Sequence, residues 1–141
     1  MACWLIKSEP FKYSWDDLRR DKRTYWDGVR NHKARNNLAA MKRGDLCLFY
    51  HSNEGLEIVG IARVVKEAYP DPTADHPRWV VVDVAPRKTL RKPVTLAALK
   101  ADPRTRGMEM VRQSRLSVSK VTDRELAAIL ELAETTLPGV G

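Results

Sequence analysis

Apolar residues occur in short runs along the chain, and polar or turn-forming residues separate these runs. Runs of this length predict β-strands. The expected strands cover residues 3–7, 46–50, 56–65, 79–85 with an extension at 88–90, and 116–121. The run at 56–65 is apolar at both alternating sets of positions, which is typical of a strand deep inside a sheet. The pattern therefore predicts a sheet of five or six strands.

Four short helices are expected around these strands, each beginning at a residue whose side chain can accept a hydrogen bond from the first helical turn. The capping residues are Ser14 for a helix through Arg19, Asn31 for residues 33–41, Thr95 for a helix with Leu96 and Leu99, and Thr122 with Glu125 for the last helix. Residues 21–30 and 69–77 are turn-like, and residues 102–113 are irregular or helical.

Strands and helices do not alternate strictly, which favours an α+β fold. A small, curved, mixed β-barrel with the helices packed outside fits this order best. The 141 residues fit a single domain, residues 1–141. No apolar segment approaches the roughly 20 residues that cross a bilayer, and the N-terminus does not resemble a signal peptide. We therefore expect a soluble cytoplasmic protein, with the monomer favoured.

The net charge is +7, and the excess of cations is uneven. Residues 1–50 carry 11 Lys and Arg against 6 Asp and Glu, and residues 101–120 carry 5 against 2. A basic surface attracts polyanions and binds phosphates without regard to sequence. Nucleic acid, either DNA or RNA, is therefore an expected partner, although many basic proteins bind none.

The motifs of common catalytic and metal sites are missing from the sequence. His32, His51 and His76 lack the spacing of zinc ligands, and there is no phosphate loop, dinucleotide fingerprint or Gly-x-Ser-x-Gly sequence. Cys3 and Cys47 fall in strand-like runs, so we expect two buried free thiols. The sequence therefore indicates no metal, no cofactor and no membrane partner.

Two clusters place aromatic side chains beside polar ones at the ends of expected elements. They are Trp26-Asp27-Gly28-Val29-Arg30-Asn31 and Tyr50-His51-Ser52-Asn53. A base that leaves its stack needs a flat wall, donors and acceptors for its edge, and cations for the flanking phosphates. Trp26 is the preferred wall, with core packing as the alternative. The clusters thus suit a planar, polar ligand such as a nucleobase.

Several ordered motifs together resemble the EVE domain. They are Trp4–Pro10, Trp26–Asn31, Ala34–Asn36, Tyr50–Asn53, Val59–Ala62, Tyr69–Asp71 and Val111–Val118. The resemblance covers nearly the whole chain and is to the bacterial, single-domain form of the family. It implies a PUA-like fold, related to the YTH domains that read methylated adenine in RNA. It also implies a pocket for a modified base, such as a cytosine altered at its fifth position.

The expected function is therefore non-enzymatic reading of a modified base. The base-binding candidates are Ser8, Trp26, Val29, Asn31, Tyr50, His51 and Trp79, and the phosphate-binding candidates are Arg30, Lys33, Arg35, Arg112 and Arg115. Neighbouring strand residues face opposite sides, so only one of Tyr50 and His51 can line a given pocket, and His51 is favoured. Helix capping alone would also explain Asn31, a simple turn would explain Ser8, and core packing is the stronger interpretation of Trp79.

Two other functions remain open at this point. One is an enzyme that acts on a modified base or nucleotide and uses His51 or Asp27 to transfer a proton. The other is a module that binds a small molecule or a protein, in which the basic surface is incidental.

Overall fold

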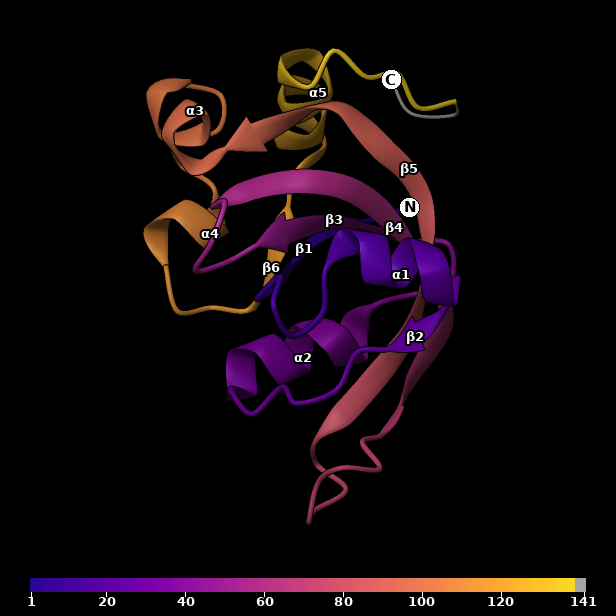
Figure 1. Ribbon diagram of the computed structural model, residues 1–141. Coiled ribbons are helices and arrows are strands. Elements are labelled where there is room, and N and C mark those ends of the chain that lie inside the picture. The colour runs from indigo at the N-terminus through magenta and orange to yellow at the C-terminus, as the bar shows by residue number, and fades with distance from the viewer. Residues whose placement is uncertain (139–141) are drawn as a thin grey trace.

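The computed structural model of this chain describes residues 1–138 and contains one mixed sheet (Figure 1). The strands lie in the order β2-β5-β4-β3-β1-β6. Their bounds are β1 Cys3–Ser8, β2 Thr24–Tyr25, β3 Leu46–His51, β4 Glu57–Pro70, β5 Val80–Thr95 and β6 Val118–Val121. β1 and β3 run parallel, and every other neighbouring pair is antiparallel.

Helices lie between and after these strands at the positions where the sequence provides caps. Their bounds are α1 Trp15–Asp21, α2 His32–Ala40, α3 Leu96–Ala101, α4 Glu109–Arg112 and α5 Asp123–Leu132. All four expected caps accept a hydrogen bond from the first helical turn. The additional helix, α4, falls in the segment left as irregular or helical. Within residues 1–138, no helix is long and apolar enough to cross a membrane.

The sheet is buried on both faces, and alternation along its central strands divides the residues between two cores. In β1, Cys3 and Leu5 enter one core, while Trp4 and Ile6 enter the other. Figure 1 shows α3 and α5 on one side of the arching strands and α1 and α2 on the other. Because helices cover both faces, both sets of alternating positions are apolar.

We call the two cores the aliphatic core and the aromatic core. The aliphatic core is formed by Cys3, Leu5, Leu46, Leu48, Tyr50, Ile58, Ile61, Leu90, Val94, Leu99, Met108, Met110, Val121, Leu126, Ile129, Leu130, Ala133 and Leu137. The aromatic core is formed by Trp4, Ile6, Trp15, Leu18, Trp26, Val29, Ala34, Leu38, Met41, Cys47, Phe49, Ala62, Val64, Val80, Val82, Val84, Leu116 and Val118.

The expected α+β class is confirmed, but the sheet is not closed into a barrel. Its edge strands are short, since β2 has two residues and β6 has four. Each pairs with one neighbour only, β2 with β5 and β6 with β1. Register shifts along β4 and β5 bend the sheet instead, because bulges increase local twist. Curvature was therefore predicted correctly, and closure was wrong.

Several strand boundaries also differ from the expectation; β6, for example, begins at Val118 instead of residue 116. The turn-like segment 21–30 contains β2, where Thr24 and Tyr25 pair with Val84 and Asp83. β4 continues to Pro70, and β5 runs unbroken through the two expected segments. β5 contains Pro86 and Pro93, and β2 pairs only with Asp83 and Val84. Both prolines therefore lie where β5 is an edge strand, a position in which proline is tolerated.

The two cysteines are buried free thiols, as expected. In the parallel register, Cys3 lies opposite Leu46 and Cys47 lies opposite Trp4. The two thiols therefore face opposite sides of the sheet, which precludes a disulfide between them. Burial raises the pKa of both thiols.

Helix α1 is fixed against the sheet by close packing of Trp15 on Gly60. A side chain at residue 60 would overlap the Trp15 indole ring. The indole Nε1 donates to Thr89 Oγ1 at 2.9 Å, and the backbone N–H of Trp15 donates to His51 Nε2 at 3.1 Å. These contacts set the position of α1 and of the loop 9–14 that precedes it.

Candidate nucleic-acid interface

A hollow of about 400 Å³ lies between the end of β1, the loop 9–14 and β2. Its lining residues are Lys7, Ser8, Glu9, Lys12, Tyr13, Thr24, Tyr25, Trp26 and Asp27. We call it the β1–β2 hollow. Its volume is within the range of roughly 300–1,000 Å³ that is usual for ligand pockets. The lining combines aromatic rings, hydroxyls, two ammonium groups and two carboxylates.

Trp26 belongs both to the aromatic core and to the wall of this hollow. Its ring is nearly perpendicular to Phe49 and Tyr13, with centroids 5.4 and 6.5 Å away. Its backbone N–H donates to the Val82 carbonyl at 2.8 Å. Only 7% of the residue is exposed. Trp26 is therefore a rigid wall that offers a small part of its surface to a ligand.

The loop that forms the other wall is closed by its own hydrogen bonds. Ser8 Oγ donates to the Tyr13 carbonyl at 2.5 Å, and the Ser8 carbonyl accepts from the Ser52 N–H at 2.9 Å. The Glu9 carbonyl accepts from the N–H groups of Lys12 and Tyr13. Ser8 thus lines the hollow and also makes the turn that the sequence offered as its alternative role.

Lys7 joins this hollow to the segment that precedes β6. Its Nζ donates to the Ser114 carbonyl at 2.8 Å and lies 5.9 Å from the centre of the Tyr50 ring. Burial lowers the pKa of Lys7. The sequence analysis did not select Lys7, although a lysine at the end of an otherwise apolar strand was a signal that could have identified it.

A second hollow, of about 330 Å³, lies on the other side of the Ser114 contact. Its lining residues are Asn31, Lys33, Arg112, Gln113, Ser114, Arg115 and Leu116. We call it the basic hollow, because it contains three of the five predicted phosphate-binding cations. Lys33 Nζ is 3.6 Å from Glu109, and Arg112 Nε donates to the Gly107 carbonyl at 2.9 Å. Asn31 caps α2 through its side chain.

Arg30 has a structural partner, the carboxylate of Asp71. Asp71 accepts hydrogen bonds from Arg30 Nη1 at 3.0 Å, from the Gly28 N–H at 3.0 Å, and from the N–H and hydroxyl of Thr73. Burial of Asp71 would raise its pKa, but these hydrogen bonds lower it to about 2. Asp71 therefore ties the Trp26–Asn31 segment to the loop between β4 and β5.

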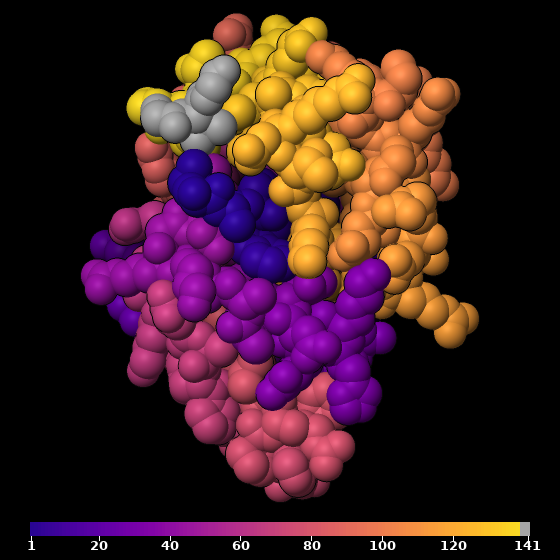
Figure 2. Space-filling view, turned by 180° about the vertical axis from the view of Figure 1, so that it is seen from behind, coloured from indigo at the N-terminus to yellow at the C-terminus, as the bar shows by residue number. Residues whose placement is uncertain are grey.

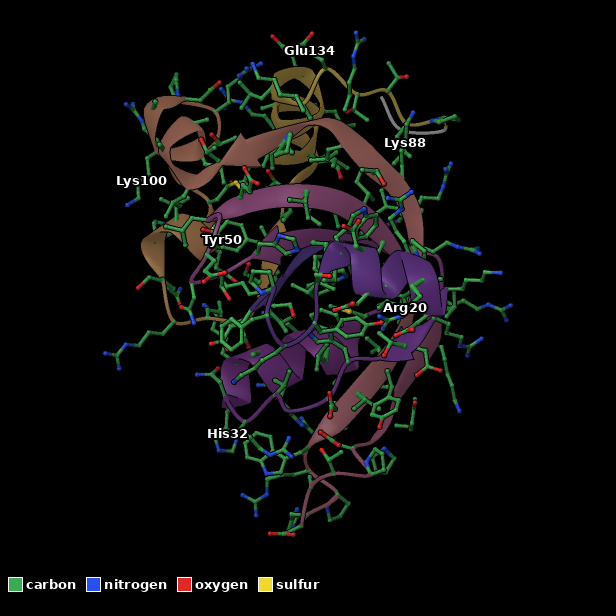
Figure 3. The ribbon with its side chains drawn as sticks, in the orientation of Figure 1. Arg20, His32, Tyr50, Lys88, Lys100 and Glu134 are labelled. Carbon is green, nitrogen blue, oxygen red and sulfur yellow. The ribbon has the colours of Figure 1, made fainter. Side chains whose placement is uncertain are left out.

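Trp79 and Arg35 lie at the same loop, apart from both hollows. The Trp79 ring packs at 5.1 Å against His32 and at 5.9 Å from the Arg30 guanidinium. Arg35 Nε donates to the Arg78 carbonyl at 2.6 Å. Figure 3 shows His32, the first residue of α2, on the side of the helix toward the β4–β5 hairpin. These side chains brace the hairpin.

Tyr50 and His51 lie on opposite faces of the sheet, as expected, and outside the residues that line the two hollows. Tyr50 is buried in the aliphatic core. His51 packs on Phe49 at 5.7 Å, and burial lowers its pKa. Its Nε2 already accepts the Trp15 N–H, so its position serves α1. Val29 is likewise buried, in the aromatic core.

A larger hollow, of about 710 Å³, lies elsewhere in the described part of the chain. It lies between the N-terminal residues, the start of β3 and α5, which Figure 2 shows side by side. Its lining is mostly aliphatic and offers few groups to recognise a polar base. Among residues 1–138, no group of three or more His, Cys, Asp or Glu could hold a metal ion.

Comparison with known proteins gives a consistent result. Human thymocyte nuclear protein 1 is 38% identical over 93% of this chain and 73% of that protein. A structure from Agrobacterium tumefaciens is 42% identical, with a TM-score of 0.94, and covers 98% of this chain and 97% of that one. A crystal structure of human THYN1 in complex with 5-methylcytosine-containing DNA is 34% identical, with a TM-score of 0.88, and covers 97% of this chain and 100% of that one.

A family model described as the EVE domain matches residues 2–132, which is most of the chain. The fold and the ordered motifs agree with that match along the same residues. The chain therefore belongs to the EVE domain family.

Proposed function

We propose that this chain is a non-enzymatic DNA-binding domain that reads a modified cytosine, with 5-methylcytosine as the first candidate. The observation that carries the proposal is the human relative in complex with 5-methylcytosine-containing DNA, which shares the fold over nearly the whole length of both chains. Relatives this similar commonly retain the class of ligand, while the residues in contact with it are free to differ.

The geometry supports a division of labour between the two hollows. The β1–β2 hollow offers Trp26 as a wall and several donors and acceptors for a base edge. The basic hollow offers Lys33, Arg112 and Arg115 for phosphates. Lys7 links the two hollows through Ser114. A base in the first would therefore leave its flanking phosphates beside the second, as recognition of an extruded nucleotide requires.

Within this proposal, the candidate residues separate into three groups. Ser8 and Trp26 line the base site, together with residues that the sequence analysis did not select as base-binding. Lys33, Arg112 and Arg115 are positioned for the DNA backbone. The supporting group is formed by Val29, Arg30, Asn31, Arg35, Tyr50, His51 and Trp79, which pack, cap or brace the walls.

The positions of the two candidate proton-transfer groups favour binding over catalysis. A general base must present a free lone pair to its substrate. His51 uses Nε2 to accept the Trp15 N–H. Asp27 is exposed to water, and no side-chain hydrogen bond within residues 1–138 orients its carboxylate toward the hollow. We therefore infer that the domain holds the base without changing it.

Fluorescence polarisation with labelled oligonucleotides tests the proposal. The panel compares cytosine with 5-methylcytosine at one position, in single- and double-stranded DNA and in the matching RNA. We expect tighter binding to the methylated DNA and weaker binding of every DNA at higher salt. Equal affinity for methylated and plain DNA contradicts base reading. A change in the mass of the recovered nucleosides contradicts the non-enzymatic role.

A further inference from the structure

One buried polar atom at the β1–β2 hollow lacks the partner that buried polar atoms usually have. Within residues 1–138, only Glu9 Oε2 and Ser119 Oγ are buried side-chain atoms without a hydrogen-bond partner. Leaving such an atom unpaired is unfavourable, and each case calls for an explanation. Ser119 lies inside the sheet, on β6. Glu9 lines a hollow large enough for a ligand.

The other oxygen of the same carboxylate is firmly held. Asn53 Nδ2 donates to Glu9 Oε1 at 2.6 Å, and Asn53 has a positive φ of 66° in the turn that follows β3. Lys12 Nζ lies 3.1 Å from Oε2, but the two groups lack the angles of a hydrogen bond. The Lys12 side chain is also 71% exposed. Asn53 therefore orients the carboxylate. Oε2 has almost no surface exposed to water, and it becomes an acceptor for a ligand when the exposed Lys12 side chain moves aside.

We propose that Glu9 Oε2 accepts a hydrogen bond from the exocyclic amine of the bound cytosine and so determines which base the site takes. This inference rests on the proposed function. A carboxylate that accepts from the N4 amine is an established way to recognise cytosine. Thymine presents a carbonyl oxygen at the same place, which would face the negative Oε2. The carboxylate therefore selects one pyrimidine and opposes the other.

The polarity of the remaining lining fits the rest of the cytosine edge. Beyond its amine, cytosine presents only acceptors, at N3 and O2. Lys12 lines the same hollow and carries an ammonium donor. The Lys7 ammonium is directed elsewhere, to the Ser114 carbonyl and the Tyr50 ring. The hollow thus combines one oriented acceptor with donors.

The sharpest test uses 5-methylcytosine and thymine, because both carry the 5-methyl group and they differ only along the edge that Glu9 would read. Single-stranded oligonucleotides with 5-methylcytosine, cytosine or thymine at one position are measured by fluorescence polarisation. The wild-type protein is expected to prefer 5-methylcytosine to thymine by about 10-fold or more.

Glu9→Gln is the decisive variant. The glutamine carbonyl can still accept from Asn53, which places an amide donor where Oε2 was. The preference for 5-methylcytosine over thymine should disappear or reverse. Glu54→Gln is the matched control, since it makes the same substitution at an exposed glutamate that lines neither hollow, and it should keep the wild-type ratio.

A second variant guards against misfolding of the first. Asn53→Ala leaves Glu9 in place and removes the group that orients it, so the ratio should fall at least about threefold. If folded Glu9→Gln or Asn53→Ala keeps the wild-type ratio, Glu9 does not read the base. If the wild-type protein binds 5-methylcytosine and cytosine equally, the proposed function is wrong, and this outcome is separate from the test of Glu9.

Discussion

The two faces of the sheet are both sealed by helices, yet they differ in what they can recognise. The aliphatic core borders the larger hollow, about 710 Å³, with few polar groups around it. The aromatic core contains Trp4, Trp15, Trp26 and Phe49 and borders a hollow of about 400 Å³ with charges of both signs. The oriented donors and acceptors around a cavity therefore matter more than its size for the kind of ligand that it suits.

The aromatic face also contains ring-to-ring contacts, whereas Tyr50 is the one aromatic residue given for the aliphatic core. Trp15 and Trp26 both meet Phe49 at centroid distances of 5.4 Å, in edge-to-face arrangements. Such contacts stabilise a fixed relative geometry of the rings. A wall that packs against these rings keeps its place when a ligand enters, and a preformed wall reduces the entropy lost on binding.

The largest loss of stability is expected for Gly60→Ala, which disturbs the packing of the aromatic face. The new methyl group would overlap the Trp15 indole, so α1 must shift, and we expect a loss of about 3 kcal/mol in unfolding free energy. Urea denaturation measures this loss. Gly107→Ala is the control, because a Cβ there meets nothing within 4 Å. Equal stability of the two variants would mean that Trp15 repacks freely.

Asp71→Ala tests whether the aromatic face depends on its tether to the β4–β5 hairpin. The change removes the acceptor for Gly28, Arg30 and Thr73, and about 2 kcal/mol of stability should be lost. Asp75→Ala, an exposed carboxylate of the same loop, should change little. Comparable losses in the two variants would place the effect in the loop as a whole.

The same residue gives a pH dependence whose sign is fixed. The pKa of Asp71 is lowered from 3.8 to about 2, so the folded state binds this proton less readily than the unfolded state. The stabilisation is present above about pH 3.8 and is lost as the pH falls toward about 2. Subtracting the Asp71→Ala stability curve from the wild-type curve isolates this contribution from those of the other carboxylates.

Variants that remove one positive charge test whether the basic hollow contacts DNA phosphates. Arg112→Ala and Arg115→Ala should each reduce the slope of log affinity against log salt by about 1, because each removes one phosphate contact. Lys88→Ala is the control, since Lys88 lies on β5, on the other side of the molecule from α4 (Figures 1 and 3). An equal decrease with Lys88→Ala would indicate diffuse attraction without a defined phosphate-binding site.

The smallest expected effect concerns His51, which supports α1 on the aromatic face. Burial lowers its pKa below the ordinary value of 6.5, and a protonated Nε2 cannot accept the Trp15 N–H. The contribution is present above about pH 6.5 and is lost as the pH falls through the folded-state pKa, by at most about 1 kcal/mol. Denaturation between pH 7.5 and 5 should show a decline that His51→Gln lacks.

Local interactions explain what could be predicted from the sequence. Ser14, Asn31, Thr95 and Thr122 cap helices where expected, because a cap depends on residues three positions away. Alternation in the central strands predicted burial on both faces. The short strand β2 was missed, since its two residues form a strand only by pairing with β5, which is distant in the sequence. Barrel closure likewise depended on edge pairing that no local pattern encodes.

The site was less predictable because its walls come from distant segments. Trp26 and Ser8 stand out as an aromatic and a hydroxyl near strand ends, and both line the β1–β2 hollow. The Glu9 carboxylate is oriented by Asn53, which lies 44 positions away in the sequence. From the sequence, His51 was favoured over Tyr50 as the residue that lines the pocket. In the fold, Tyr50 packs in the aliphatic core and His51 accepts the Trp15 N–H, and both lie away from the hollow.

The opposed cysteines make the two faces separately observable. Cys3 belongs to the aliphatic core and Cys47 to the aromatic core, and both thiols are buried with raised pKa values. A thiol reagent can reach Cys47, which is 0% exposed, only when the aromatic core opens, whereas Cys3 is 5% exposed at the wall of the larger hollow. The rate of thiol modification at each cysteine therefore reports on one face of the sheet. DNA that stiffens only the aromatic side should slow modification of Cys47 more than that of Cys3.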